Sequence, residues 1–419
     1  MVEMTLHSLY LCYFGLREPL VQTQVLPYLR QLASAGTKIS LLTFEPALRQ
    51  NWNPRDLDEA RTRLAGEGIR WHCLAYHKKP SIPATLYDIL AGARLARRLI
   101  REEGVQVLHA RAHVPMAMAM LAATAKTKLI FDVRGLMAEE YRDAGVWTED
   151  SLPFRLVKKI ERHGLKRADQ VVVLTRRLRD RLISEELAAA EKIEVIPCCV
   201  NPELFATASA GSNSSRSERF EVIYAGSLVG LYLVEEIGRF FMALKERQPN
   251  AFLRLLSVSP PEQGAHLLRQ AGLNADDFWI GAVAAADVPS YLRRANLGIS
   301  FRKPTFAQIA ASPTKIPEYL AAGLPVVSNA GIGDMDDLLE REGVGVIVRE
   351  FNAVEFARAV EVAQTLAEDP SVRAHCAEVA RLHFDLKSVG GKGYANVYSR
   401  LANMSDQNSA IKLTATPDI

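Results

Sequence analysis

Short apolar runs alternate along the first half of the chain with segments whose apolar residues recur at helical spacing. Residues 20–35 show the helical spacing clearly, and Gly36 follows them where a helix C-cap belongs. The expected strands are residues 8–13, 38–44, 105–110, 129–133, 170–174 and 193–197. The expected helices are residues 20–35, 86–100, 114–125, 154–167 and 176–185. Strands that alternate with helices of this length predict a parallel sheet covered on both faces.

The alternation stops and then resumes in the second half. Residues 206–217 are small and polar without an apolar period, which predicts an exposed linker or loop. The strands expected after it are residues 220–224, 251–256, 278–280, 297–301, 325–329 and 344–348. The expected helices are residues 234–247, 264–271, 288–294, 335–341 and a short one ending at Gly323. From about residue 404 the period is lost, which predicts a disordered tail.

This pattern predicts two α/β halves joined near residue 205. The length of 419 residues agrees, because ~150 residues per domain allows two to three domains. Open parallel sheets bind ligands beyond the carboxyl ends of their strands, so we expect the site in a cleft between the halves.

Composition narrows the class of protein. With 48% hydrophobic and 24% charged residues, each half can build a core without disulfides or metals. The charge balance of 51 basic against 48 acidic residues is too even for a protein that coats nucleic acid. No apolar run approaches the ~20 residues of a membrane span, and the first residues lack the features of a secretory signal. Five cysteines without CxxC spacing favour a cytoplasmic protein.

One basic segment allows contact with a membrane surface or an anionic acceptor. The alternative is a solvated helix face, so membrane contact is expected to be peripheral at most. The basic residues of this segment are Lys158, Lys159, Arg162, Lys166 and Arg167.

The segment with the most chemical information, residues 312–329, reads SPTKIPEYLAAGLPVVSN. Pro317 fits the first turn of a helix, where its missing N–H costs nothing. With Thr314 as N-cap, the amides of Lys315 and Ile316 would point outward beside the Lys315 ammonium, which is a seat for a phosphate. Glu318 lies one turn later and could accept from the vicinal hydroxyls of a ribose. The alternative is a capped core helix on which Lys315 and Glu318 are merely solvated.

The same segment resembles the donor-binding signature of GT-B glycosyltransferases, specifically the retaining family 4 group. Further landmarks of that group follow the same order over roughly residues 8–400. They are ADQVVVLT at residues 168–175, KIEVIPCCVNPELF at 192–205, YAGSL at 224–228 and ANLGIS at 295–300.

The resemblance implies two Rossmann-like, doubly wound domains that face each other across a cleft. Residues 1–202 would form the acceptor domain and residues 203–385 the donor domain. Residues 386–403 would form a helix that crosses back to the first domain, and residues 404–419 the tail. The implied reaction moves a sugar from a nucleotide-diphosphate donor to an acceptor hydroxyl, with retention and without a metal or other cofactor. Glu318 would bind the ribose, and Lys315 and Gly15 would lie near the diphosphate.

Two departures from the family pattern concern the donor site. The first glutamate of an E-x7-E pair falls on Ala310, and no arginine or lysine follows Gly226-Ser227. Arg302 and Lys303 follow a strand at the same expected edge and could supply the charge, unless they form a solvated loop. The expected donor-binding set is Gly15, Gly226, Ser227, Arg302, Lys303, Ser312, Thr314, Lys315, Ile316 and Glu318.

For the acceptor side we expect His113, Asp132 and Arg134, because both loops that carry them follow parallel strands. A histidine beside a carboxylate can orient or deprotonate a hydroxyl, and the arginine could hold an acidic or phosphorylated acceptor. The family usually has a histidine near the Asp-Val-Arg-Gly of this chain, so that assignment does not carry over directly. The structural alternative is that His113 bonds at the start of its helix.

Other readings stay open at this stage. The D-x-D of Asp334 and Asp336 opens an expected helix, where acids favour the dipole. The acceptor is unknown and could be a growing glycan or a lipid-linked molecule, and no nucleic acid is expected. A nucleotide-sugar 2-epimerase of the same fold is one rival. The other is a non-catalytic scaffold, for which Ala310 is the main argument.

Overall fold

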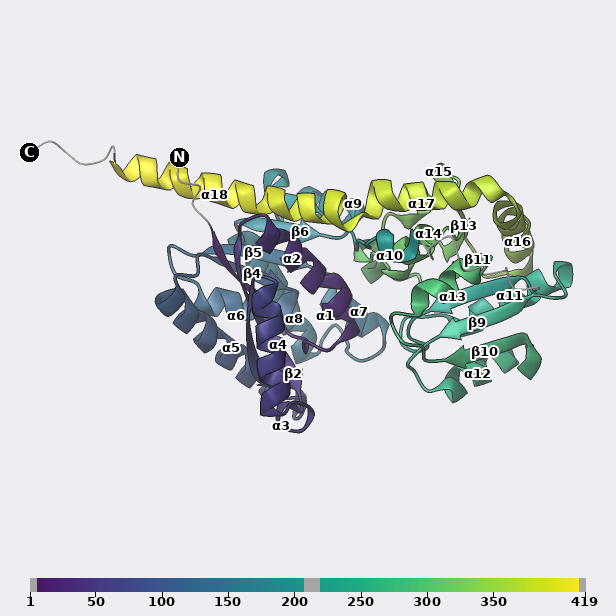
Figure 1. The fold of residues 1–419 in the computed structure, drawn as a ribbon, viewed down its shortest axis with the longest axis horizontal. Coiled ribbons are helices and arrows are strands. Elements are labelled where there is room, and N and C mark those ends of the chain that lie inside the picture. Colours follow the sequence, from purple (N-terminus) through teal and green to yellow (C-terminus); the bar gives the residue numbers. More distant parts are fainter. Residues whose placement is uncertain (1–5, 207–218, 414–419) are drawn as a thin grey trace, which may run out of the picture. The chain divides into compact units, whose positions relative to one another are not determined.

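The computed structural model describes residues 6–206 and 219–413, as two compact units (Figure 1). Unit 1 holds Met1–Ile196 and Gly390–Ile419, and unit 2 holds Pro197–Val389. The units therefore divide at residues 196 and 389, where the sequence suggested 202 and 385. Most of the expected linker, residues 207–218, lies outside the described residues.

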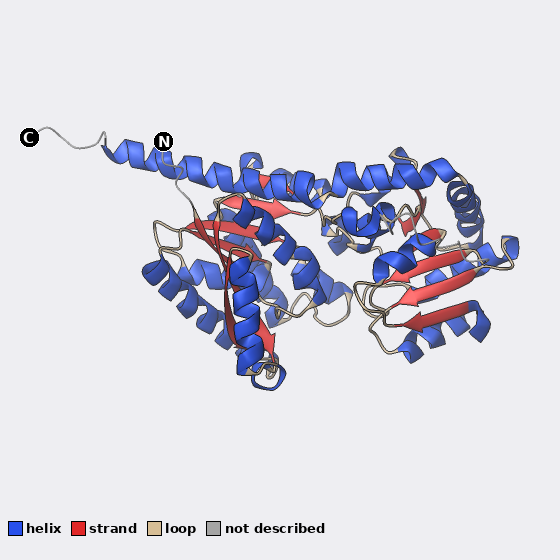
Figure 2. Ribbon diagram, in the orientation of Figure 1, coloured by secondary structure: helices blue, strands red, loops and turns tan. Residues whose placement is uncertain are grey.

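Unit 1 contains a seven-stranded parallel sheet in the order β3-β2-β1-β4-β5-β6-β7 (Figure 2). The strands are β1 (His7–Cys12), β2 (Lys38–Pro46), β3 (Ile69–Tyr76), β4 (Val107–Arg111), β5 (Lys128–Val133), β6 (Gln170–Val173) and β7 (Ile193–Val195). The order reverses between β1 and β4, which is the doubly wound topology that the family resemblance implies. Strand β3, at one edge, was missed because it alternates apolar and polar residues, as in Ile69-Arg70-Trp71-His72, and has no continuous apolar run at its start.

The helices of unit 1 agree with the helical periods in part, and α3 and α4 were not expected. The expected helix over residues 20–35 is split at Val25, because Pro27 starts a new helix one turn later. A short helix, α7, was expected to be loop. The helices are α1 (Pro19–Gln24), α2 (Leu26–Ser34), α3 (Leu48–Asn51), α4 (Pro54–Gly66), α5 (Ser81–Glu103), α6 (His113–Ala122), α7 (Met137–Asp143), α8 (Leu152–Arg167) and α9 (Arg176–Ser184).

The C-terminal helix belongs to unit 1. A π-helical segment, η4 (Leu386–Gly391), leads into α18 (Lys392–Leu413). The helix therefore continues past residue 404, which corrects the expectation of a disordered tail from there; residues 414–419 lie outside the described part. Four residues on one face of α18 are buried: Tyr394, Val397, Tyr398 and Leu401.

Unit 2 contains a six-stranded parallel sheet in the order β10-β9-β8-β11-β12-β13. Its strands are β8 (Glu221–Ala225), β9 (Phe252–Leu256), β10 (Phe278–Gly281), β11 (Leu297–Ser300), β12 (Val326–Asn329) and β13 (Gly345–Val348). The helices are α10 (Glu203–Ala206), α11 (Val234–Arg247), α12 (Pro261–Gln270), α13 (Val288–Arg294), α14 (Lys315–Ala321), α15 (Met335–Arg341), α16 (Ala353–Glu368) and α17 (Pro370–Phe384).

Adjacent residues of the unit 2 strands point into two different cores. Val326 of β12 packs with α14, α15 and α17, whereas Val327 packs with α11 and α16. Because successive strand residues face opposite sides of a sheet, both faces are covered by helices, as the continuous apolar runs predict. Among the described residues, no helix is long and apolar enough to cross a membrane.

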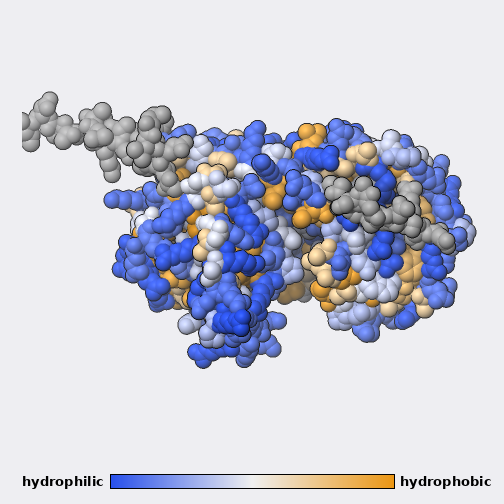
Figure 3. Space-filling view, in the orientation of Figure 1, coloured by the Kyte–Doolittle hydropathy of each residue, from blue (hydrophilic) through white to orange (hydrophobic). Residues whose placement is uncertain are grey.

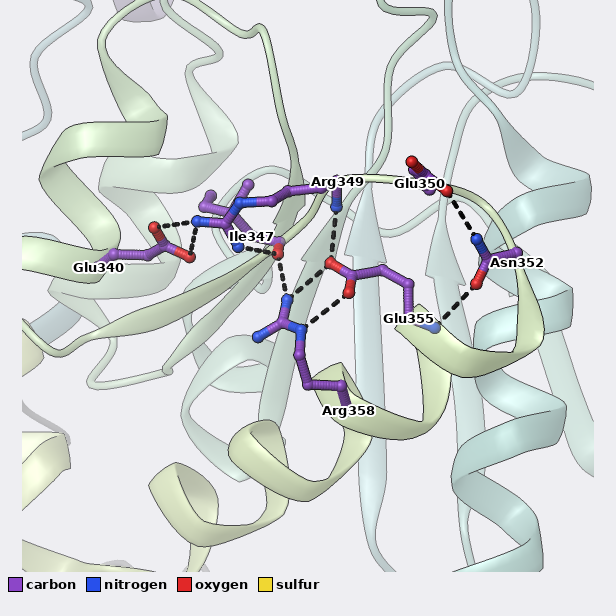
Figure 4. Close-up of polar contacts among 7 residues, drawn as sticks. All are labelled: Glu340, Ile347, Arg349, Glu350, Asn352, Glu355 and Arg358. Carbon is purple, nitrogen blue, oxygen red and sulfur yellow. Dashed lines mark hydrogen bonds and ion pairs between the residues drawn. The ribbon is translucent and has the colours of Figure 1, made fainter.

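A polar network fixes the start of α16 after β13 (Figure 4). The Asn352 side chain caps the helix by accepting from the Glu355 backbone N–H at 2.9 Å. The Glu355 carboxylate accepts from the Arg358 guanidinium at 2.7 and 2.8 Å and from the Arg349 backbone N–H at 2.8 Å. The bonds from Arg358 in particular lower the pKa of Glu355 to about 2.

A lowered carboxylate pKa stabilises the fold above the usual pKa of glutamate, and this stability is lost as the pH falls toward about 2. We therefore expect Glu355→Gln to lower the melting temperature at pH 7 and to have a smaller effect at pH 3. Since the site is partly exposed, the loss should be about 1 kcal/mol or less. Calorimetry of both forms at the two pH values measures it. Glu361→Gln, on the exposed side of the same helix, is the control, and a pH-independent difference would contradict the assignment.

Candidate functional site

Helix α14 begins as the sequence predicts. Lys315, Ile316 and Pro317 are its first three residues, and Thr314 is the N-cap. Two details differ from the expectation. The Ile316 N–H donates to the Pro313 carbonyl at 3.2 Å, and the Thr314 side chain makes no capping bond. One of the two amides expected to bind a phosphate is therefore already used, and the Lys315 side chain is the main cationic group at the start of α14.

The Lys315 ammonium is buried without a hydrogen-bond partner among the described residues. Lys315 is 5% exposed, and its Nζ lies 3.9 Å from the ring centroid of Tyr224 and 4.3 Å from that of Tyr232. Burial holds the pKa of Lys315 well below its usual range, and the charge of Arg302 lowers it further. Cation–π contacts offset only part of the cost of burying this charge. The site is thus short of one negative charge.

Gly226 is required by this arrangement. Its φ is +147°, and a Cβ there would stand 2.8 Å from the Lys315 Nζ. The loop after β8 is closed by the next residue, because the Ser227 carbonyl accepts from the Tyr224 hydroxyl and its Oγ accepts from the Val229 N–H at 3.3 Å. Ser227 therefore shapes the loop, while Gly226 makes room for the ammonium.

Arg302 brings a second cation to the same aromatic ring. Its guanidinium carbon lies 5.1 Å from the Tyr232 centroid, and its Nε is buried without a hydrogen bond in the described part of the chain. The Arg302 backbone N–H donates to Asn329 Oδ1 at 2.7 Å, which ties the residue to β12. Two positive groups beside one tyrosine ring repel each other, and an anion that contacts both would relieve that cost. Lys303 is exposed, and its backbone N–H donates to the Leu231 carbonyl at 2.8 Å.

Glu318 is half-buried one turn beyond Lys315. Burial raises its pKa to about 7, against the opposing effect of the Lys315 charge. Ser312, in contrast, is engaged by the fold: its Oγ accepts from the Cys198 N–H at 3.0 Å.

The position of the missing family glutamate, Ala310, is fully buried at the end of the 3-10 helix η3 (Phe306–Ala310). Two residues earlier, Gln308 is also fully buried, and neither its Oε1 nor its Nε2 has a hydrogen bond among the described residues. A buried amide without a bond costs free energy, so this side chain is suited to a ligand. Sequence reasoning missed Gln308; the only signal was a polar residue within the apolar run AQIAA.

In unit 1, the structure does not bring His113, Asp132 and Arg134 together as one exposed group. His113 is 1% exposed, and its Nε2 lies 3.1 Å from Glu161 Oε2, inside the unit's own core. Glu161 also pairs with Lys158, which in turn lies 2.7 Å from Glu139. This corrects the expected acceptor role of His113, and it removes Lys158 from the proposed basic face. His113 is the structural residue of the alternative reading.

Asp132 is fully buried and serves the packing of α18. It accepts from the Tyr394 hydroxyl at 3.0 Å, and Arg134 and Arg111 lie 3.6 and 3.8 Å away. Burial alone would raise the pKa of Asp132, but the Arg134 charge, a bond from His109 and the Arg111 charge together hold it well below its usual range. A carboxylate so enclosed binds a helix rather than an acceptor, so the predicted catalytic role of Asp132 and Arg134 is not supported by this geometry.

Gly15 follows β1, where a Cβ would stand 2.8 Å from Pro46 Cδ and 3.0 Å from Glu45 Oε2. Packing against β2 is therefore one sufficient reason for this glycine.

Two family models match the chain, one in each unit. The model described as "Glycosyl transferase 4-like domain" matches residues 21–199, and "Glycosyl transferases group 1" matches residues 219–365. The chain belongs to the group 1 glycosyltransferases. This confirms the family suggested by residues 312–329 and the landmarks around them.

Solved structures confirm the GT-B fold of this glycosyltransferase. A glycosyltransferase from Rickettsia africae is similar with a TM-score of 0.69 at 14% identity, over 95% of this chain and 99% of that one. Sucrose-phosphate synthase from Thermosynechococcus elongatus has a TM-score of 0.69 at 17% identity, over 94% and 99%. HepE from Anabaena, in complex with UDP and glucose, has a TM-score of 0.63 at 15% identity, over 94% and 99%.

A sequence relative matches a smaller part of the chain. TuaH of Bacillus subtilis, named as a teichuronic acid biosynthesis glycosyltransferase, is 25% identical over 174 residues, which is 41% of this chain. The match spans 43% of the length of TuaH.

The acidic pair noticed in the sequence has a structural use in this glycosyltransferase. Asp334 is the N-cap residue of α15, and Asp336 Oδ2 accepts from the Gly331 N–H at 2.9 Å. In the described residues, no group of three or more histidine, cysteine, aspartate or glutamate side chains is placed to hold a metal ion.

The isolated ammonium of Lys315 generates a two-part prediction. Lys315→Met should leave the melting temperature equal or higher, because it removes a buried charge, while UDP affinity falls by about ten-fold or more. Wild-type binding of UDP should also be accompanied by proton uptake, since burial lowers the pKa of Lys315 and a phosphate beside it raises the pKa again. Titration calorimetry in two buffers of different ionisation enthalpy measures both effects. Lys387→Met, at an exposed position of unit 2, is the control; unchanged affinity in Lys315→Met would contradict the assignment.

The core position of His113 predicts a loss of stability without a loss of nucleotide binding. His113→Ala leaves a cavity and removes one of the two partners of the buried Glu161, so urea unfolding should show a loss of roughly 2–4 kcal/mol. UDP affinity should stay within about two-fold, because the cationic site is built entirely from unit 2. His163→Ala, on the exposed side of α8, is the matched control. A stable variant with reduced turnover would return His113 to the active site.

Proposed function

We propose that this group 1 glycosyltransferase moves a sugar from a nucleotide-diphosphate donor to an acceptor hydroxyl, with retention of configuration. The observation that carries the proposal is the buried Lys315 ammonium, which has no hydrogen-bond partner in the described structure and shares Tyr232 with Arg302. A diphosphate supplies the missing negative charge.

The chemistry needs positive charge at this place. As the bond to the sugar breaks, charge builds on the departing diphosphate, and fixed cations that meet it lower the barrier. Lys315 and Arg302 are already desolvated and oriented, so little reorganisation is required at the moment of reaction. In this proposal Lys303 adds a positive charge beside Arg302, and no metal or other cofactor takes part.

Glu318 is proposed to bind the ribose, since a half-buried carboxylate one turn from the phosphate site can accept from two vicinal hydroxyls. Gln308 takes the place that the family glutamate leaves at Ala310, as an uncharged partner for the donor. HepE, a structural neighbour, has been crystallised with UDP and with UDP-glucose, which supports a nucleotide-sugar as the donor class.

The acceptor is proposed to be a growing glycan, with a lipid-linked molecule as the other possibility from the sequence. The name of TuaH supports a role in polysaccharide synthesis. We propose a cytoplasmic enzyme with peripheral membrane contact at most.

A panel of nucleotide-sugars tests the proposal. A donor present at ~100 times its dissociation constant should stabilise the protein by ~2.7 kcal/mol in a thermal shift assay. The selected donor should then be turned over to nucleoside diphosphate with excess EDTA present. Binding without release would support the scaffold reading favoured by Ala310, and conversion to an epimer would support the epimerase. Loss of turnover in EDTA, restored by Mg²⁺ or Mn²⁺, would overturn the metal-free part.

The ribose assignment predicts that Glu318→Ala lowers kcat/KM by about ten-fold or more with little change in melting temperature, since a bond to a charged group is worth ~1.5–3 kcal/mol. Glu318→Gln keeps an acceptor oxygen and should lose less. Because the pKa of Glu318 is about 7, the ratio of wild-type to Glu318→Gln kcat/KM should rise between pH 6 and pH 8. Steady-state kinetics at both pH values measures the ratio, and a constant ratio would count against a charged acceptor.

A further inference from the structure

Unit 1 contains a cavity of about 1280 Å³ that none of the donor-binding chemistry uses. Its lining includes seven consecutive residues, 68–74, and therefore most of strand β3. Strand β3 pairs only with β2, so its other side is a free edge of the sheet. In the described part of the chain, residues 69–74 form no backbone hydrogen bonds beyond that ladder. Helices α4 and α5 contribute the remaining walls.

The lining carries seven basic side chains and no acidic one. Three of them, Lys38, Arg61 and Arg70, come from β2, α4 and β3, and all three are exposed. In Figure 3 the surface over α4 is predominantly hydrophilic. A concave surface lined by one sign of charge concentrates its field, so this groove attracts anions.

Helix α5 contributes the other four cations. Arg94, Arg97, Arg98 and Arg101 are exposed and recur at three- and four-residue spacing, which places them on one face of the helix. Three of the seven cations form ion pairs with acids outside the lining: Arg98 with Glu102 at 3.6 Å, Arg70 with Glu103 at 3.0 Å and Arg61 with Asp58 at 3.2 Å. Arg97 donates to the Leu121 carbonyl. Arg94 and Arg101 form no ion pair among the described residues. Guanidinium groups bind carboxylate and phosphate in a bidentate manner, so a row of four fits a ligand with repeated negative charges.

The groove follows β3 from its first residues as far as Leu74, and the strand ends at Tyr76. The rest of its lining lies at the amino ends of the strands, because it comes from the start of β2 and the C-terminal parts of α4 and α5. The residue after Tyr76, His77, has its Nδ1 at 2.6 Å from Asp88 Oδ1. Asp88 is fully buried and also accepts from the Tyr13 hydroxyl at 2.7 Å, so it holds the imidazole in one orientation. Carboxyl ends of parallel strands are where such folds place their reacting groups.

We propose that the groove along β3 binds the anionic glycan chain that serves as acceptor, upstream of its reacting end, with Arg94 and Arg101 as its principal contacts. This inference rests on the proposed function, because it names the class of acceptor. A flat anionic bilayer would contact only groups that protrude from the protein, whereas β3 lies in the groove lined by α4 and α5. A linear polymer fits the groove, its charges meet the arginines, and its hydroxyls meet the free backbone groups of the strand.

The test uses an octamer of galacturonic acid as the anionic probe and malto-octaose as the neutral one, titrated into the full-length protein. The acidic octamer should bind and the neutral one should not. Arg94→Gln/Arg101→Gln should weaken binding by ~10-fold, because glutamine keeps the helix propensity and removes the charge. The matched control is Arg55→Gln/Arg155→Gln, which removes two exposed charges from the same unit outside the groove. UDP binding is measured on every variant and should be unchanged.

Three outcomes would overturn the proposal: no binding of the acidic octamer, equal weakening in both double variants, or groove-dependent binding of phosphatidylglycerol vesicles without binding of the octamer. Loss of UDP binding and turnover in the wild type, with octamer binding intact, would count against the proposed function instead. The two inferences therefore fail in distinguishable ways.

Discussion

The proposed donor site depends on one cation without a hydrogen-bond partner in the described structure, the ammonium of Lys315. A buried cation without a hydrogen bond is costly, and unit 2 meets that cost with the faces of Tyr224 and Tyr232 and the missing Cβ of Gly226. Replacement of Gly226 by any other residue would force a side chain into the place of the ammonium. The raised pKa of Glu318 and the lowered pKa of Lys315 share one physical cause, which is that both groups are removed from water before a ligand arrives. The fold holds the site in a state that a diphosphate would stabilise.

The buried carboxylates of unit 1 differ from Lys315, because they lie next to groups of opposite charge. Asp132 is surrounded by Arg134, Arg111 and the Tyr394 hydroxyl, and Glu161 by His113 and Lys158. Each of the two carboxylates has cationic partners inside the protein. The Tyr394 bond instead joins α18 to the sheet, which makes the C-terminal helix part of unit 1. The paired carboxylates stabilise unit 1, whereas the Lys315 ammonium, without a hydrogen-bond partner in the described structure, indicates the proposed ligand site.

The groove along β3 differs from both because its cations are exposed. Exposed arginines cost little without a ligand, and their interaction with one is screened by salt. The inference of a polyanionic chain rests on the number of basic side chains in the lining and on the lack of an acidic residue there. It does not rest on the strength of each contact. Such a site suits a substrate that must slide or be released after each transfer, whereas the donor site in unit 2 must hold its ligand firmly.

The sequence by itself determined the architecture and the family. Strand periods identified all strands but β3, because burial on both faces of a parallel sheet leaves continuous apolar runs, and Pro317 placed the start of α14 correctly. The order of short motifs around residues 312–329 was sufficient for the glycosyltransferase family. The search for continuous apolar runs missed β3, which alternates apolar and polar residues, and several helices, among them α4, α16, α17 and the part of α18 beyond residue 404.

Only the tertiary structure decided which charged residues are free to act. His113 and Lys315 both follow a strand and start a helix in the sequence, yet one is paired with Glu161, from 48 residues away, and the other has no hydrogen-bond partner in the described structure. The seven cations of the groove come from β2, α4, β3 and α5, and no local pattern shows that they share a cavity. A side chain's pairing, burial and pKa depend on neighbours that are distant in the chain, and these neighbours are set by the packing of the sheet and its helices.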